Sequence, residues 1–196
     1  MRHSEKVTQV PPHPGPGQPA GERAVYTIGH STRELDRFVA LLDREHVRHV
    51  ADVRSFPGSR RYPQFGREAL AASLAARGIG YSHHPDLGGR RRAREDSPNG
   101  AWRNASFRGY ADYMSTQAFA RSLDDLIDLA ARERTAIMCA EAVPWRCHRS
   151  LIADALVARG VSVQHILDAR TEPHRLTPFA VVREGVVYYP PEQPAL

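Results

Sequence analysis

The segment Thr135-Ala136-Ile137-Met138-Cys139 decides the fold of this chain. Its residues are nearly all apolar, which is typical of a central strand in a parallel sheet, because helices cover both faces of such a strand. A helical pattern of apolar residues precedes the segment over 118–132, and another follows over 148–159 and stops at Gly160. The segment therefore predicts a buried strand between two helices of an α/β domain.

The same alternation of short apolar runs and helical patterns extends outward from this strand. Further strands are expected over 25–28, 49–54, 79–83 and 161–167. Further helices are expected around 35–42, 67–77 and 108–114. The pattern predicts a single-domain, three-layer α/β fold, in which a mostly parallel, twisted sheet carries helices on both faces, as in Rossmann-like proteins.

The two ends of the chain differ from the part between them. Residues 1–23 contain a run of prolines and glycines that cannot form a helix and has little to bury, so we expect a disordered tail. The α/β domain is expected over 24–168, with a long basic loop near 85–106. Residues 169–196 form a C-terminal extension, in which Arg183-Glu184-Gly185 is a candidate turn of a short hairpin.

Length and composition exclude several classes of protein. The chain has 196 residues, of which 41% are hydrophobic and 25% are charged, so it can bury an ordinary core. No apolar run reaches the roughly 18–20 residues that a membrane span needs, and the first residues lack the apolar segment of a secretory signal. Two cysteines cannot hold a fold of this size together through disulfides. We therefore expect a cytoplasmic protein with reduced thiols and no membrane partner, and leave its oligomeric state open.

Arginine supplies almost all of the positive charge. Of 27 basic residues only Lys6 is a lysine, which leaves 26 arginines, and the net charge is +5. Between Arg54 and Arg108 there are 11 arginines against four acidic residues, an excess of 7. This concentration of charge suits an anionic partner, either a small molecule or a nucleic acid. The alternative is a solvated surface that uses arginine because the genome is GC-rich.

Polar and titratable side chains follow the expected strands at their carboxyl ends. The candidate site residues are, in chain order, His30, Arg54, Ser59, Cys139, Glu141, Cys147, His148 and Arg149. Open α/β sheets bind their ligands beyond the carboxyl ends of the strands, and we find no comparable set at the opposite ends. This clustering predicts an active or binding site.

Three of these residues favour an enzyme. Cys139 is the candidate nucleophile or redox thiol, because nearby arginines and a helix N-terminus lower the pKa of a thiol; a buried, inert cysteine is the alternative. Glu141 is the candidate general acid or base, or else the structural partner of an arginine. His30 is a candidate proton carrier, or a structural histidine at the tip of its strand.

The other candidates point to an anionic substrate. Arg54 and Arg149 can hold a phosphate or carboxylate in a two-pronged contact, although Arg54 can instead neutralise a nearby carboxylate. We expect Ser59, Cys147 and His148 to contribute to substrate binding, the last two because the start of a helix attracts anions. The sequence therefore predicts an enzyme with a cysteine-containing site that acts on a nucleotide, a nucleic acid or another phosphate-bearing molecule.

A metal- or redox-responsive thiol protein is a second possibility. Cys139, Cys147 and His148 are suitable ligands for zinc or iron, with a fourth ligand from His30, His83 or His84. However, the C-x7-C-H spacing matches no standard zinc motif, and a helix would point adjacent residues in different directions. We therefore predict no metal site and leave the cofactor open. A reversible disulfide between the two cysteines is compatible with the length of the loop that joins them.

A non-catalytic nucleic-acid-binding protein is the main alternative to an enzyme. The basic loop contains the arginine cluster Arg90, Arg91, Arg92 and Arg94. The nearby aromatic residues are Trp102, Phe107 and Tyr110. Surfaces that bind nucleic acids combine positive charge with aromatic rings in this way, so a salt-dependent affinity for DNA or RNA is expected under this alternative.

Four segments carry a resemblance to a known family. They are Thr27-Ile28-Gly29-His30-Ser31, Asp52-Val53-Arg54 with Pro57 and Ser59, Leu87-Gly88-Gly89, and Cys139-Ala140-Glu141 through Cys147-His148-Arg149. With this combination of motifs, the chain resembles the bacterial and archaeal family called domain of unknown function 488, from about Thr27 to Ile166. The resemblance implies a compact α/β domain with a cysteine-bearing site, and it supplies no reaction.

Overall fold

The computed structural model describes residues 24–58 and 60–191, so the tail expected over 1–23 lies outside it. Six strands form one sheet in the spatial order β3-β2-β4-β1-β5-β6. They are β1 (Ala24–Gly29), β2 (His49–Asp52), β3 (Gly80–His83), β4 (Thr135–Cys139), β5 (Ser162–Ile166) and β6 (Thr171–Pro173). The first five strands are parallel, and β6 runs antiparallel to β5. β4 lies inside the sheet, as its apolar sequence predicts.

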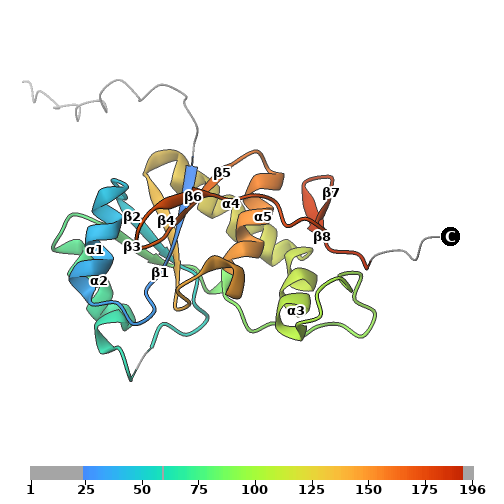
Figure 1. Ribbon diagram of the computed structural model, residues 1–196, viewed down its shortest axis with the longest axis horizontal. Coiled ribbons are helices and arrows are strands. Elements are labelled where there is room, and N and C mark those ends of the chain that lie inside the picture. Colours follow the sequence, from blue (N-terminus) through green and yellow to red (C-terminus); the bar gives the residue numbers. More distant parts are fainter. Residues whose placement is uncertain (1–23, 59, 192–196) are drawn as a thin grey trace, which may run out of the picture.

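Helices cover both faces of the sheet (Figure 1). One face carries α1 (Leu35–Arg44) and α2 (Arg67–Ala75), and the other carries α3 (Ala105–Met114), α4 (Gln117–Arg132) and α5 (Arg149–Ala158). The three-layer, mostly parallel α/β fold expected from the sequence is therefore confirmed. Among the described residues, no helix is long and apolar enough to cross a membrane.

β4 shows how the core is divided between the two faces. Its five residues are all buried. Ala136 and Met138 pack into the core on the side of α1 and α2, whereas Ile137 and Cys139 pack into the core on the side of α4 and α5. Successive side chains of a strand point to opposite faces, so Cys139 at the end of β4 lies on the side of α5.

The crossover connections place a crevice at one edge of the sheet. From β1 the chain passes through α1 to β2, which lies beyond β4; from β4 it passes through α5 to β5, which lies beyond β1. These two connections run in opposite directions over opposite faces. Their helices therefore diverge beyond the carboxyl ends of β1 and β4, which is where open α/β sheets bind ligands.

Helix ends follow local chemistry. Gly78 (φ 70°) and Gly160 (φ 77°) adopt the left-handed conformation shortly after α2 and α5, where the absence of a Cβ removes the strain. α3 begins earlier than expected, inside the basic loop. Its start is set by Asn104, whose side chain accepts hydrogen bonds from the backbone N–H groups of Ser106 and Phe107. The apolar pattern alone does not record this cap.

The C-terminal extension packs against the rest of the chain. β6 continues the sheet beside β5, and β7 (Val181–Arg183) and β8 (Val186–Tyr188) form a hairpin. The turn residues Glu184 and Gly185 both have positive φ, as a two-residue hairpin turn requires. Tyr189 is fully buried, and its hydroxyl donates a hydrogen bond of 2.7 Å to the carboxylate of Asp154 on α5. The extension therefore shares the core of the α/β domain.

Candidate functional site with two cysteines and a histidine

A pocket of about 370 Å³ opens beyond the carboxyl ends of β2 and β4. Its walls come from residues within five segments: 54–56, 89–90, 106–110, 139–141 and 146–148. Five of the predicted site residues line it: Arg54, Cys139, Glu141, Cys147 and His148. The pocket has the size of an ordinary small-molecule site.

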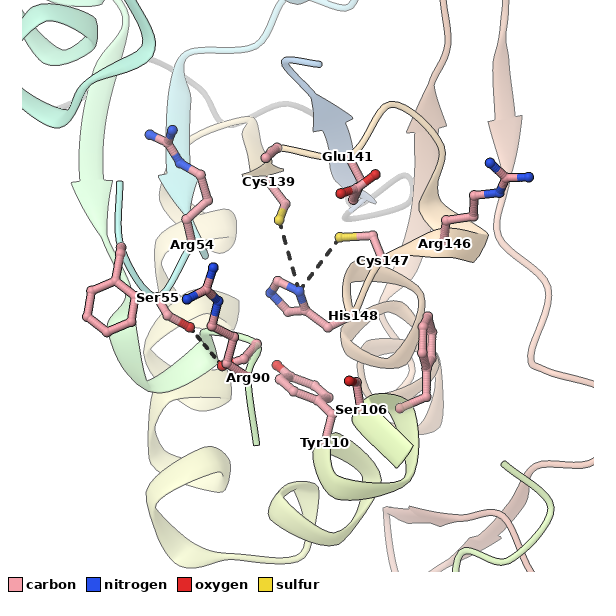
Figure 2. Close-up of a pocket in the computed structure, with 14 residues that line it drawn as sticks. Arg54, Ser55, Arg90, Ser106, Tyr110, Cys139, Glu141, Arg146, Cys147 and His148 are labelled. Atoms are coloured by element: carbon pink, nitrogen blue, oxygen red, sulfur yellow. Dashed lines mark hydrogen bonds between the residues drawn. The ribbon is translucent and has the colours of Figure 1, made fainter. Parts of the chain in front are cut away.

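Two thiols and one imidazole meet in this pocket, and we call them the Cys-Cys-His centre (Figure 2). His148 Nδ1 lies 3.6 Å from Cys147 Sγ and 4.0 Å from Cys139 Sγ, and all three ligand atoms lie within 4.8 Å of one another. The second ring nitrogen, Nε2, is 3.0 Å from the carbonyl oxygen of Val53 and donates to it, because a carbonyl can only accept. In the neutral imidazole the lone pair therefore lies on Nδ1 and faces both sulfur atoms.

The backbone between β4 and α5 brings these side chains together. Cys147 is extended (φ −140°, ψ 147°), His148 is the N-cap, and α5 begins only at Arg149. The expectation that a helix would separate the side chains of Cys147 and His148 is therefore wrong, because Cys147 precedes the helix. The histidines considered as a fourth ligand lie outside this group: His30, His83 and His84.

The two thiols are unpaired and buried, and they differ in acidity. The pKa of the Cys147 thiol lies well below its ordinary value, chiefly because Cys139 donates a hydrogen bond to its sulfur; the charge of Arg149 and a protonated His148 ring lower it further. The pKa of Cys139 is raised well above its ordinary value, because its proton is held in that bond and because burial disfavours a thiolate. Cys147 is therefore the more readily ionised of the two cysteines.

Arg149 places a buried positive charge next to the thiols. It is 1% exposed, one of its terminal nitrogens donates to the carbonyl oxygen of Glu141, and its Nε has no partner. Within the described part of the chain it forms no ion pair with a carboxylate. A buried cation needs negative charge nearby, and ionised sulfur supplies it. Arg149 does not line the pocket, so it acts on the site through the cysteines.

Arg54 lines the pocket, but its charge is neutralised by an ion pair with Asp52. Its Nε and a terminal nitrogen bind the buried carboxylate of Asp52 at 2.9 and 2.5 Å, and its other terminal nitrogen donates to His30 Nε2 at 3.3 Å. His30 Nδ1 donates to the carbonyl of Ser31, and the ring stacks on Phe65. Burial lowers the pKa of His30 to about 4. Both ring nitrogens of His30 are thus occupied, and this residue positions Arg54 instead of lining the pocket.

Glu141 lies at the mouth of the pocket with an exposed side chain, and Figure 2 shows its carboxylate beside Cys147. The loop that carries Glu141 packs tightly against β1. A Cβ atom at Gly29 would lie 1.7 Å from the backbone oxygen of Glu141, so only glycine allows this approach. Ser59, the remaining predicted residue, lies outside the described residues.

Two arginines of the basic loop are engaged within the protein. The guanidinium of Arg91 lies over the ring of Tyr113, 3.6 Å from its centroid. Arg94 forms an ion pair with Asp96 at 2.7 Å. Arg94 stays exposed in this ion pair, and binding of nucleic acid by the loop stays a prediction.

Arg90, Arg92 and Arg103 are also exposed, and of these three only Arg90 lines the pocket, where its guanidinium lies over the ring of Phe56, 5.8 Å from its centroid. Arg90 has a left-handed backbone (φ 63°), which is uncommon for a residue with a side chain, and Figure 2 shows its guanidinium pointing into the pocket. Ser55 holds this turn by donating to the carbonyl of Gly89 at 2.7 Å. Arg146 is exposed on another wall, and in the described residues neither it nor Arg90 pairs with a carboxylate.

The sequence analysis named Phe107 and Tyr110 as aromatic neighbours of the basic loop, but it did not place them in this pocket, and it missed Phe56. The ring of Tyr110 lies 5.1 Å from that of His148, and its hydroxyl donates to the carbonyl of Leu87 at 2.7 Å. Phe56 is 74% exposed at the rim. The sequence could have indicated Phe56: it precedes the proline and glycine of a turn, and a large apolar side chain in a turn is expected to be exposed instead of packing in the core. The only signal for Tyr110 was its nearness to the basic loop, since α3 reaches the pocket only through the fold.

A match to a known family covers well over half of the chain. Residues 34–156 match the model of the family described as Domain of unknown function DUF488. The chain belongs to the DUF488 family. The matched segment of this DUF488 protein includes the whole Cys-Cys-His centre, and the resemblance drawn from the sequence motifs is confirmed. No curated protein and no solved structure matches the chain.

Proposed function

We propose that this DUF488 protein is an enzyme that acts on a small anionic substrate at the Cys-Cys-His centre. The observation that carries the proposal is that this centre and the guanidinium of Arg90 line the same pocket. A reactive group, a cation for substrate binding and a titratable carboxylate at Glu141 are thereby brought together. The position beyond the carboxyl ends of parallel strands supports the same conclusion.

Different residues of the pocket bind different parts of the substrate. Arg90 binds the anionic group, because its positive charge is not used in an ion pair within the described residues, and Arg146 provides a second cation. Phe107 and Tyr110 offer ring faces to the apolar or planar part of the substrate, which suits a nucleotide. Glu141 acts as general acid or base, because an exposed carboxylate at the mouth exchanges protons readily with water.

A small substrate accounts for these observations better than a nucleic acid does. Arg91 and Arg94 are engaged with Tyr113 and Asp96, which leaves Arg92 and Arg103 as exposed arginines of the loop that do not line the pocket. A nucleic-acid surface gains its affinity from many phosphate contacts, so neutralising Arg92 would then weaken binding as much as neutralising Arg90.

Calorimetric titration of the purified protein with inorganic phosphate and adenosine monophosphate tests the substrate class. Hydrogen bonds to charged groups contribute about 1.5–3 kcal/mol, so Arg90→Ala should weaken binding roughly 10- to 100-fold. Arg92→Ala is the matched control from the same loop and should change the affinity less than about twofold. Equal losses in the two variants, or no saturable binding by the unaltered protein, would refute the proposal.

Turnover of nucleoside mono-, di- and triphosphates, followed by chromatography of the products, tests the enzymatic part. Glu141→Gln preserves the shape of the side chain and should retain ligand binding, while turnover falls by a factor of roughly 100 or more. Turnover that is unchanged in this variant contradicts the role of Glu141. If none of the ligands that bind is converted, the protein is a binding protein and the enzymatic proposal fails.

A further inference from the structure

We propose that the Cys-Cys-His centre is a Zn²⁺ site with one coordination position open to the pocket. This inference rests on the proposed function and names the group that makes its centre reactive. The first reason is the kind of ligand: two thiolates and one imidazole are preferred ligands of zinc, and soft sulfur ligands disfavour Mg²⁺ and Ca²⁺. The sequence suggested these three ligands but argued against a metal site on their spacing and on the direction of a helix, and Cys147 in fact precedes α5.

The distances fit tetrahedral coordination. With bonds of about 2.3 Å to sulfur and 2.0–2.1 Å to nitrogen, tetrahedral angles place sulfur and nitrogen about 3.6 Å apart and two sulfurs about 3.8 Å apart. His148 Nδ1 lies 3.6 Å from Cys147 Sγ and 4.0 Å from Cys139 Sγ, and no pair of ligand atoms exceeds 4.8 Å. Side-chain shifts of about an ångström or less would bring all three ligands to bonding distance.

His148 is already oriented as a ligand. Histidines that bind metals usually donate their second N–H to a carbonyl or carboxylate, which fixes the tautomer and the ring plane. His148 makes this contact through Nε2 with the carbonyl of Val53 at 3.0 Å. Val53 directly follows β2, the parallel neighbour of β4, so the sheet itself holds the ring against the two sulfurs. Metal binding therefore requires neither a ring rotation nor the loss of this hydrogen bond.

The fourth position faces the substrate. In the described residues no other cysteine, histidine or carboxylate belongs to this cluster. Catalytic zinc sites have three protein ligands and an open position, whereas structural sites have four protein ligands. Because all three ligands line the pocket that Arg90 and Glu141 also line, a water molecule or a substrate oxygen can reach the open position. Zinc in such a site polarises a substrate oxygen or makes bound water more acidic.

The charges are also compatible with a bound dication. Zn²⁺ with two thiolates and a neutral imidazole carries no net charge, so the buried site avoids the free-energy penalty of an isolated ion. Arg149 stabilises negative charge on both sulfurs, because its own buried charge has no carboxylate partner among the described residues. The anionic substrate then approaches from the side of Arg90.

Titration of the metal-free full chain with Co²⁺ is the direct test. We expect one Co²⁺ per chain, a near-ultraviolet band from thiolate-to-cobalt charge transfer, and the intense visible bands of tetrahedral cobalt. Stoichiometric Zn²⁺ should displace the cobalt and abolish these bands. A weak, octahedral cobalt spectrum without charge transfer would overturn the inference.

Variants assign the ligands. Cys139→Ser, Cys147→Ser and His148→Gln should each lower the Zn²⁺ affinity by a factor of roughly 100 or more. His46→Asn is the control, because His46 is exposed, lies outside the cluster and has a left-handed backbone (φ 53°) that asparagine tolerates. Equal affinity in the control and in all three ligand variants would refute the site.

A second measurement needs no variant and holds if a substitution prevents folding. In the unaltered chain, Zn²⁺ should slow alkylation of both cysteines by iodoacetamide, and a chelator should restore the rate; unchanged rates contradict the inference. The anion titration separates the two proposals. Phosphate binding that depends on Arg90, without any zinc binding, leaves the proposed function standing and overturns the zinc site. Zinc binding without phosphate binding supports the zinc site and overturns the proposed function.

Discussion

Replacing Asp154 by asparagine should destabilise the protein by about 3 kcal/mol. Asp154 is a fully buried carboxylate on α5. It accepts four hydrogen bonds of 2.6–2.9 Å: one from His174 Nε2, two from the backbone and hydroxyl of Thr177, and one from the Tyr189 hydroxyl. All of these donors belong to the C-terminal extension, so this one carboxylate holds three residues of the extension against α5.

The carboxylate also sets the direction of a chain of hydrogen bonds. Asp154 accepts from His174 Nε2, and when the His174 ring is neutral its Nδ1 accepts from His165 Nε2 at 2.9 Å. His165 Nδ1 then accepts from the hydroxyl of Thr27 on β1 at 2.8 Å. Each buried polar atom along these hydrogen bonds then has a partner. An amide at position 154 leaves one acceptor oxygen for the four donors.

The magnitude follows from the bonds that an amide cannot accept. Asparagine keeps one acceptor oxygen and turns an NH₂ group toward the other donors. Two of the four bonds are lost, and hydrogen bonds to a charged group contribute about 1.5–3 kcal/mol each. The hydroxyls of Thr177 and Tyr189 can rotate to accept from the amide, so we expect the lower limit of about 3 kcal/mol. For a chain of this length that lowers Tm by about 6–12 °C.

Thermal and urea unfolding followed by circular dichroism measure this loss. Asp128→Asn is the control, because Asp128 is an exposed aspartate on α4, and it should change the free energy of unfolding by less than about 0.5 kcal/mol. If Asp154→Asn unfolds within about 2 °C of the unaltered chain, the carboxylate does not anchor the extension and the reasoning fails.

Two further predictions concern β1 and the buried histidine. Gly29→Ala should destabilise the protein by more than about 3 kcal/mol and abolish phosphate binding, because the new Cβ would collide with the backbone at Glu141. Gly58→Ala is the control, because a Cβ atom there meets open space. Similar unfolding curves for the two variants would contradict the prediction. Burial lowers the pKa of His165 from 6.5 to about 3, so below about pH 6.5 the unfolded chain binds a proton that the folded chain does not. The free energy of unfolding, measured by urea titration, should therefore fall by about 2 kcal/mol from pH 7 to pH 5. In His165→Gln the free energy of unfolding should fall by about 2 kcal/mol less over the same pH range.

Much of the fold could be predicted because its signals are local. The apolar run of β4 reports burial on both faces, and the glycines at 78 and 160 report helix ends, so the boundaries of β4 are as expected and those of α5 differ by one residue. The start of α3 was missed because one hydrogen-bonding side chain, that of Asn104, determines it, and hydrophobic periodicity does not detect such a cap.

The candidate site could be predicted only in part. The rule that strand ends carry the ligand site located Cys139, Glu141 and Arg54, which all line the pocket. Arg54 was expected to hold an anionic substrate, but Asp52 at the end of β2 already neutralises its charge. Arg149 is buried because it is the first residue of α5, which packs against the core, and its guanidinium donates to the backbone carbonyl of Glu141. Pairing partners of this kind depend on side-chain direction, which residue types alone do not specify.

The sequence by itself determined the elements of this protein: parallel strands between helices, polar residues at the strand ends, and membership of the DUF488 family. Only the tertiary structure decided which of those residues meet. Strand order sets β2 beside β4, so the carbonyl of Val53 reaches His148 and turns its Nδ1 toward the sulfurs of Cys139 and Cys147. The physical reason is that secondary structure depends on periodicities a few residues long, whereas these groups come from segments that contact one another only when the sheet forms.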